Sequence, residues 1–123
     1  MARVSLRVTF TEETALGPGK VRLLELIAET GSISAAGRAM AMSYRRAWNL
    51  VDDLNATFEE PLVSAQPGGS KGGGASLTQA GREVIRRYRA IDAAVAAHAR
   101  GHVDALTKML AAPNKKRRSM RAK

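Results

Sequence analysis

The side chains best suited to chemistry in this chain lie between positions 43 and 49. Arginine can donate two hydrogen bonds to O6 and N7 of guanine, asparagine can pair with adenine, and a serine in the first turn of a helix can bind a phosphate. Residues of these types follow one another here at helical spacing: Ser43, Tyr44, Arg45, Arg46 and Asn49. The stretch therefore predicts a helix whose N-terminal half contacts DNA.

A helix-turn-helix pattern must position these residues. Ser32 and Ser43 each stand at an N-cap position, and the segment between them is short. The apolar stripe behind the second cap has the spacing of a helix that ends near Pro61: Ala47, Leu50, Val51, Leu54 and Phe58. Charged residues on an isolated helix usually form a solvated face without a specific function. Here a preceding helix is joined by a short turn, and this is the arrangement in which the second helix enters a major groove.

Packing between the two helices is expected to depend on small and apolar residues. The small side chains that allow the helices to approach closely are Ala35, Ala36 and Ala39. The apolar side chains that fix the angle between them are Met42, Ala47 and Val51. Ala41 occupies the turn between them, and an ordinary right-handed turn can accept alanine there. A single tryptophan on a helix usually packs into a core, so Trp48 is assigned to packing and not to base contact.

A hairpin with a glycine-rich tip follows the second helix of the pair. We expect strands at 62–65 and 75–77, joined by a loop from Gln66 to Gly74. The loop lacks the glycine before the lysine, the following Ser or Thr and the following helix of a phosphate-binding P-loop. As a wing, it would contact the DNA backbone through Lys71, Gly72 and Gly73. The alternative is a flexible turn without a function.

The remaining elements flank this unit. Alternation of apolar and polar residues predicts a strand over the first ten residues, and a helical pattern beginning near Val21 ends at Gly31. A long helix is expected from Thr78 to about Leu110. One seam of this helix has residues four and three apart, typical of a face that pairs with another helix: Val84, Tyr88, Ile91, Val95 and His98. We therefore expect a homodimer.

Composition limits the classes of protein that remain. The chain has 123 residues, 45% of them apolar and only 4% aromatic, with no cysteine. These values favour a mainly helical cytoplasmic protein without disulfides, and no segment approaches the roughly 20 apolar residues of a membrane span. The net charge is +9, and the last ten residues hold six Lys or Arg. We expect a DNA-binding domain over 1–110, with the dimerisation helix at about 78–110, and a disordered basic tail over 111–123.

Neither catalysis nor cofactor binding is expected from the sequence. No combination of serine, histidine and carboxylate places a nucleophile beside a base. His98 and His102 have a metal-binding spacing, but the chain has no cysteine and no third ligand nearby. We therefore predict no enzyme, no metal site and no cofactor.

Several of these stretches together resemble a known family. The segments are 31–36 (GSISAA), 42–48 (MSYRRAW), 61–63 (PLV), 68–75 (GGSKGGGA) and 77–78 (LT). They are similar to the N-terminal DNA-binding domain of ModE-type molybdate-responsive transcriptional regulators and, more distantly, to LysR-type domains. The resemblance covers about residues 3–110. Ala41 is a departure, because many such proteins have glycine in this turn.

The resemblance implies a winged helix-turn-helix that binds double-stranded DNA at palindromic sites as a dimer, formed through the long helix and helped by the N-terminal strand. It also implies a role in molybdenum homeostasis. Full-length members bind molybdate or tungstate in C-terminal domains, and this chain stops where those domains would begin, so direct molybdate binding is not expected.

Two other functions remain open at this point. The chain could be an architectural or nucleoid protein, which predicts steep salt dependence with little sequence preference. It could also be an interaction module whose long helix pairs with a separate sensor subunit. A membrane role for the basic tail is not favoured, because the tail has no apolar face.

Overall fold

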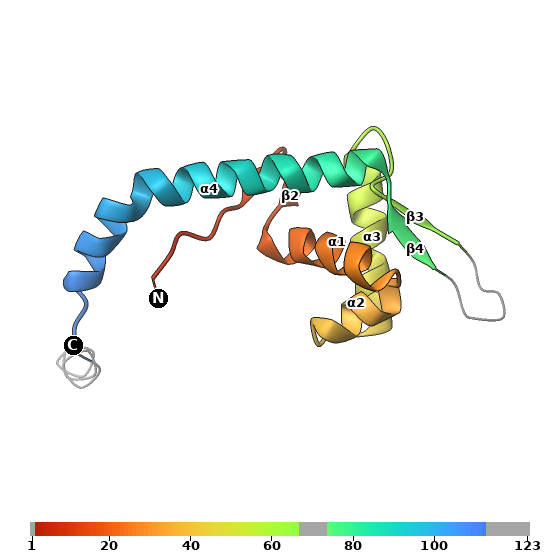
Figure 1. The fold of residues 1–123 in the computed structure, drawn as a ribbon, viewed down its shortest axis with the longest axis horizontal. Coiled ribbons are helices and arrows are strands. Elements are labelled where there is room, and N and C mark those ends of the chain that lie inside the picture. Colours follow the sequence, from red (N-terminus) through yellow and green to blue (C-terminus); the bar gives the residue numbers. More distant parts are fainter. Residues whose placement is uncertain (1, 67–73, 113–123) are drawn as a thin grey trace. The chain divides into compact units, whose positions relative to one another are not determined.

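The computed structural model of the chain describes residues 2–66 and 74–112. Within them the elements follow the order β1 (Val8–Thr9), β2 (Ala15–Leu16), α1 (Pro18–Thr30), α2 (Ile33–Ala39), α3 (Tyr44–Thr57), β3 (Val63–Ala65), β4 (Ala75–Leu77) and α4 (Gln79–Lys108). The protein is mainly helical, with small two-stranded sheets and a long C-terminal helix (Figure 1). The expected class, a winged helix-turn-helix, is confirmed.

Contacts divide the chain into two units, which are described separately. One unit comprises Ser5–Ile91, and the other combines Met1–Val4 with Asp92–Lys123. The larger unit contains α1, α2 and α3 gathered together, with the β3–β4 hairpin projecting to one side (Figure 1). The expected boundary at residue 110 between a DNA-binding domain and a tail stays a prediction, and residues from 113 onward lie outside the described part of the chain.

The core of the larger unit is aliphatic, as the scarcity of aromatic residues suggests. Helix α1 contributes four fully buried side chains, which are joined by side chains from every other helix of this unit and from both strands of the β3–β4 hairpin. The buried set is Leu16, Val21, Leu23, Leu24, Ile27, Ile33, Ala36, Ala47, Val51, Leu54, Leu62, Val63, Leu77 and Tyr88. Burial of this apolar surface is the main favourable term that holds the three helices together.

The ends of the first helices follow the local sequence signals. Pro18 occupies the first turn of α1, where its missing N–H costs nothing, so the helix begins three residues before Val21, where the helical pattern of the sequence begins. Gly31 closes α1 in the left-handed region at φ 71°. The hydroxyl of Ser32 accepts a hydrogen bond from the N–H of Ala35 at 3.0 Å, which confirms this N-cap.

The expected strand over the first ten residues is wrong for most of its length. Of residues 2–10, which the structure describes, only Val8 and Thr9 form a strand, paired antiparallel with Leu16 and Ala15. The partner strand cannot extend further, because α1 begins at Pro18. Period-two alternation predicts an extended backbone, but a ladder also requires a partner of matching length.

The turn between α2 and α3 also differs from the prediction. Ala41 has φ 56°, in the left-handed region, and not in the right-handed turn that alanine accepts without strain. The N–H of Met42 donates to the carbonyl of Gly37 at 3.0 Å and the N–H of Ala41 to that of Arg38, so closing α2 requires this conformation. A side chain with a Cβ is strained there.

Replacing Ala41 with glycine should therefore raise the free energy of unfolding by about 0.5–1 kcal/mol, after allowing for the greater entropy that glycine has in the unfolded chain. Urea denaturation followed by circular dichroism measures the change. Ala90→Gly is the matched control, because Ala90 lies exposed inside α4 and its replacement should destabilise by a similar amount. Equal destabilisation by both substitutions would contradict the strain at Ala41.

Helix α4 runs for 30 residues, from Gln79 to Lys108, and confirms the long helix predicted from the sequence. Gly101 lies inside it with no heavy atom within 4 Å of the position a Cβ would take. Among the described residues, none of the helices combines the length and hydropathy needed to cross a bilayer.

Candidate nucleic-acid interface

Helix α3 has a buried face and an outer face. Ala47, Val51 and Leu54 are buried against the core. With about 3.6 residues per turn, Arg45 and Asn49 lie on the side opposite to this core, and both are exposed. The hydroxyl of Ser43 accepts a hydrogen bond from the N–H of Arg46 at 3.1 Å, so the predicted N-cap is confirmed and the first turn of α3 is fixed.

The two flanks of α3 carry different side chains. Tyr44 and Trp48, four residues apart, share one flank, and Tyr44 is 63% exposed. Their rings meet edge to face, with centroids 6.1 Å apart. Trp48 is partly buried against the core, in agreement with its assignment to packing. Its indole N–H is buried without a hydrogen-bond partner among the described residues. Arg46 and Leu50 share the opposite flank.

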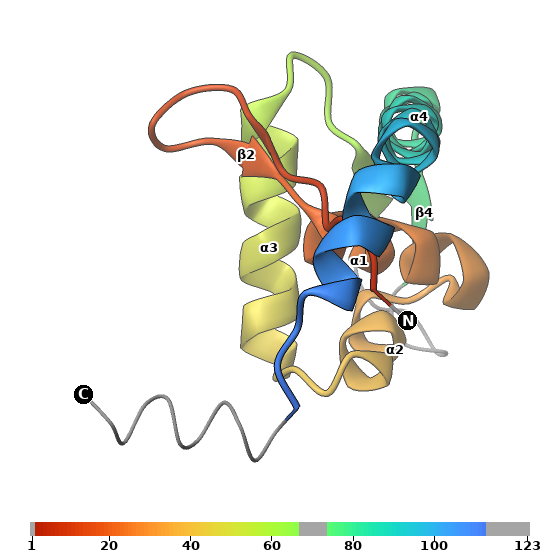
Figure 2. The ribbon, with the colours of Figure 1, turned by 90° about the vertical axis from the view of Figure 1, so that its left-hand side faces the viewer.

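A glycine permits the close approach of α2 and α3, which Figure 2 shows side by side near the N-terminal end of α3. A Cβ added to Gly37 would lie 2.8 Å from the Cβ of Ala47, closer than real carbon atoms approach. Ala36 is fully buried, but Ala39 is exposed. The alanines predicted to allow this approach are therefore only part of the explanation, because Gly37 forms the closest contact.

An asparagine near the end of α3 fixes the hairpin to the helix. The side-chain oxygen of Asn55 accepts hydrogen bonds from the N–H groups of Leu62 and Val63 at 2.8 and 3.0 Å, and its amide donates to the carbonyl of Val63. The first residues of the hairpin thus obtain partners that a sheet would otherwise supply. Sequence reasoning missed Asn55, although a polar residue four positions after buried Val51 is a usable signal.

The start of α4 holds the same segment from the other side. Thr78 caps the helix by accepting from the N–H of Gly81 at 3.0 Å, and its own N–H donates to the carbonyl of Leu62 at 2.9 Å. A Cβ on Gly81 would lie 2.3 Å from that carbonyl oxygen. Strand β3 pairs antiparallel with β4 in the register Val63↔Leu77, which sets the direction of the hairpin.

The predicted wing residues Lys71, Gly72 and Gly73 lie outside the described residues. The structure does describe the base of the hairpin, at Gln66 and Gly74. The N–H of Gln66 donates to the carbonyl of Gly74 at 2.8 Å, and the N–H of Ala75 donates to the carbonyl of Gly31. The base of the hairpin is therefore attached to the C-terminal end of α1.

The charged side chains fall into two groups. Arg22, Arg86, Arg87 and Arg89 form ion pairs with glutamates on α1 and α4. Hydrogen bonds from Arg86 and Arg87 lower the pKa of the Glu83 carboxyl to about 2, and Arg89 lowers the pKa of Glu25. In the described part of the chain, no carboxylate lies within ion-pair distance of the arginines at the start of α3. Their charge remains available to an external anion.

Comparison with known proteins supplies the family. The sequence model for bacterial regulatory helix-turn-helix proteins of the lysR family matches residues 19–82, just over half of the chain, which spans α1 to the beginning of α4. The chain belongs to this family. The matched segment contains the helix-turn-helix formed by α2 and α3. The resemblance to ModE-type domains is confirmed by the relatives that follow.

Three relatives illustrate that likeness. The chain is 49% identical over 81 residues to the molybdenum-pterin-binding protein MopB of Rhodobacter capsulatus, covering 66% of this chain and 30% of that protein. It is 41% identical over 92 residues to the molybdenum transport protein ModE of Azotobacter vinelandii, covering 75% of this chain and 33% of that protein. It is 34% identical over 87 residues to the DNA-binding transcriptional dual regulator ModE of Escherichia coli K12, covering 71% of this chain and 33% of that protein. The chain thus matches about a third of the length of these relatives.

The LysR-family fold places the predicted dimer residues in unequal environments. Tyr88 is only 2% exposed, and its hydroxyl donates to the carbonyl of Leu6 at 2.6 Å, so it packs in the core of its own chain. Val84 is half-buried against the same core. Ile91 is 43% exposed, Val95 is half-buried and His98 is exposed. Ile91 and His98 are thus the most exposed of the five, and Val84 and Val95 retain part of their surface.

Proposed function

We propose that the chain is a sequence-specific transcriptional regulator of the ModE type. The observation that carries this proposal is the pair Arg45 and Asn49 on the outer face of α3, opposite the core and without carboxylate partners in the described part of the chain. A helix that enters the major groove presents its outermost side chains to base edges, where arginine recognises guanine and asparagine recognises adenine.

The other predicted contacts surround this pair. Tyr44 is exposed beside it, and the hydroxyl of Ser43 retains its proton for donation to a phosphate. Further along the helix, Asp52 and Asp53 are exposed and would repel the DNA backbone. Base contact is therefore confined to the first two turns of α3. Lys71, Gly72 and Gly73 of the wing are proposed as backbone contacts.

We also propose that two copies bind a palindromic site. Apolar side chains at the end of α4 and just after it are largely uncovered, with Leu106 at 63% exposure and Met109 and Leu110, which follow the helix, at 79% and 74%. An uncovered helix segment of this length is marginal in water, so a partner helix would stabilise it. Two copies would place two recognition helices in successive major grooves, about 34 Å apart.

Replacement of Leu106 with glutamate should weaken self-association at least tenfold, because a charge would be buried in the helix pair. Sedimentation velocity measures the dissociation constant. Ala97→Glu is the matched control, since Ala97 is exposed on the opposite side of α4. Dimers of unchanged stability in Leu106→Glu would contradict this seam, and a purely monomeric wild type would favour pairing with a separate sensor subunit.

The names of the relatives suggest the regulated process. MopB is described as molybdenum-pterin-binding and the Azotobacter protein as a molybdenum transport protein. We propose that this chain controls genes of molybdenum supply. The matched region is the helix-turn-helix part, so nothing in it supports direct binding of molybdate by these residues.

The experiment selects duplexes from a randomised library with the protein itself and compares the selected site with a scrambled one by fluorescence anisotropy at several salt concentrations. A specific regulator should prefer the selected site by roughly 10³ or more at physiological salt. Each titration is repeated with molybdate, which should leave the preference unchanged. Equal binding to both duplexes with a steep salt dependence would support an architectural protein instead.

A further inference from the structure

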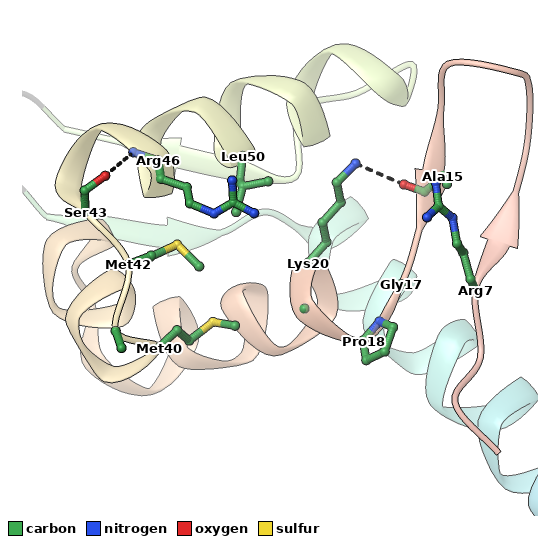
Figure 3. Close-up of a pocket in the computed structure, with 12 residues that line it drawn as sticks. Arg7, Ala15, Gly17, Pro18, Lys20, Met40, Met42, Ser43, Arg46 and Leu50 are labelled. Carbon is green, nitrogen blue, oxygen red and sulfur yellow. Dashed lines mark hydrogen bonds between the residues drawn. The ribbon is translucent and has the colours of Figure 1, made fainter. Parts of the chain in front are cut away.

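Beside the outer face of α3 lies an open hollow lined by basic side chains from three separate segments (Figure 3). Arg46 comes from the first turn of α3, Lys20 from the first turn of α1, and Arg7 from the segment before β1. None of the described residues that line it is acidic. The three cations are also without a carboxylate within ion-pair distance in the described part of the chain.

The geometry keeps these positive groups together. The ammonium of Lys20 donates to the carbonyl of Ala15 at 3.1 Å, which holds its charge at the rim. Figure 3 shows Arg46 extending from α3 toward Lys20, with Arg7 on the far side beside Ala15. Like charges brought together without counter-ions raise the electrostatic energy of the free protein, and an anion bound among them removes that repulsion.

The remaining lining of the hollow indicates which anion fits. Pro18, Met42 and Leu50 supply apolar surface next to the cations. A free inorganic anion would leave this apolar surface uncovered, whereas a deoxyribose-phosphate unit carries the C–H groups of its sugar beside its charge. The hollow therefore matches the chemistry of the DNA backbone.

The position of Arg46 on α3 leads to the same conclusion. The major groove is about 12 Å wide and a helix with its side chains measures about 10–12 Å, so both flanks of an inserted helix face the phosphate walls. Arg45 lies on the outer face of α3, whereas Arg46 lies about 100° further round, on the flank that faces Lys20.

We propose that the adjacent arginines have different targets: Arg46, Lys20 and Arg7 together hold one backbone phosphate of the DNA, and Arg45 with Asn49 reads the bases. This inference rests on the proposed function. It reassigns Arg46, which the sequence placed with the base-reading residues, and it extends the interface to the N-terminal segment and the first turn of α1.

The test measures two quantities for each variant on the selected and scrambled duplexes: the ratio of the two affinities and the dependence of affinity on salt. Arg46→Ala, Lys20→Met and Arg7→Ala should each weaken both duplexes by the same factor, leave the ratio within about twofold, and reduce the salt slope by about one. Arg45→Ala should lower the ratio by roughly 5- to 150-fold.

Three controls separate charge from structure. Lys20→Arg should restore the salt slope, because it retains both the charge and a donor for Ala15. Arg22→Ala removes one charge from an exposed ion pair on α1 and should change neither quantity by more than about twofold. Single methylphosphonate substitutions in the duplex should identify one phosphate whose neutralisation weakens the wild type but not Arg46→Ala.

The outcomes distinguish this inference from the proposed function. If the wild type prefers the selected duplex and Arg46→Ala loses that preference as Arg45→Ala does, Arg46 reads bases and the inference is overturned. Unchanged affinity and salt slope in Lys20→Met and Arg7→Ala would also overturn it, as would inorganic phosphate that binds the hollow without competing with DNA. Absence of any preference in the wild type overturns the proposed function itself.

Discussion

Replacement of Gly81 with alanine is expected to lower the free energy of unfolding by about 3 kcal/mol. The added Cβ would lie 2.3 Å from the carbonyl oxygen of Leu62, which is backbone and cannot rotate away. Moving that carbonyl would break its hydrogen bond with the N–H of Thr78 and disturb the contacts of Asn55. The gain in helix propensity from alanine, about 1 kcal/mol, is smaller than this cost.

The same substitution elsewhere in α4 supplies the control. Gly101 has open space at the Cβ position, so Gly101→Ala should be neutral or stabilise the helix by up to about 1 kcal/mol. Urea denaturation measures the change in the free energy of unfolding for Gly81→Ala. Amide hydrogen exchange around residue 101 measures the change in local helix stability for Gly101→Ala. A Gly81→Ala variant as stable as the wild type would show that α4 and the hairpin do not approach as closely as described.

Replacement of Gly37 with alanine is expected to cost about 2 kcal/mol and to weaken DNA binding. Its Cβ would meet that of Ala47 at 2.8 Å, so α2 and α3 would have to separate. Because α2 sets the position of α3, the base-reading face would shift relative to the rest of the interface. Chemical denaturation and anisotropy on the selected duplex measure the two effects.

A second substitution makes this prediction specific. In an Ala47→Gly background the obstructing methyl is absent, and the next neighbour of a Cβ on Gly37 is the Cγ of Met42 at an ordinary 3.5 Å. Gly37→Ala should then be neutral or stabilising, so that the two sites show a coupling of about 1–2 kcal/mol. Equal costs in both backgrounds would contradict direct contact between these positions.

The helical elements could be predicted from the sequence because their signals are local. Ser32 and Ser43 cap the helices they precede, and Gly31 ends α1. The apolar stripe of α3 identified its buried face, and the exposure of Arg45 and Asn49 follows from it. Periodicity and capping reflect interactions within one or two turns, so the sequence contains them directly.

The failures concern features that depend on distant segments. Glycine is required at positions 37 and 81 because atoms of another segment lie where a Cβ would be. The sequence pattern does not show which segments approach these positions. Tyr88 has the spacing of a helical seam, but its hydroxyl donates a hydrogen bond to the carbonyl of Leu6, far away in the chain. Ala41 adopts a left-handed conformation that helix closure imposes. The basic hollow beside Arg46 likewise becomes evident only once α1 and the N-terminal segment are placed beside α3.

The most direct test of base reading by α3 is a scan of every base-pair substitution across one half-site of the selected duplex, measured with the wild type and with Arg45→Ala. For the wild type, substitutions at contacted positions should each cost about 1–3 kcal/mol of binding free energy. Arg45→Ala should remove the preference at one or two base pairs and leave the others intact. A flat profile for the wild type, or an identical profile for the two proteins, would contradict the account.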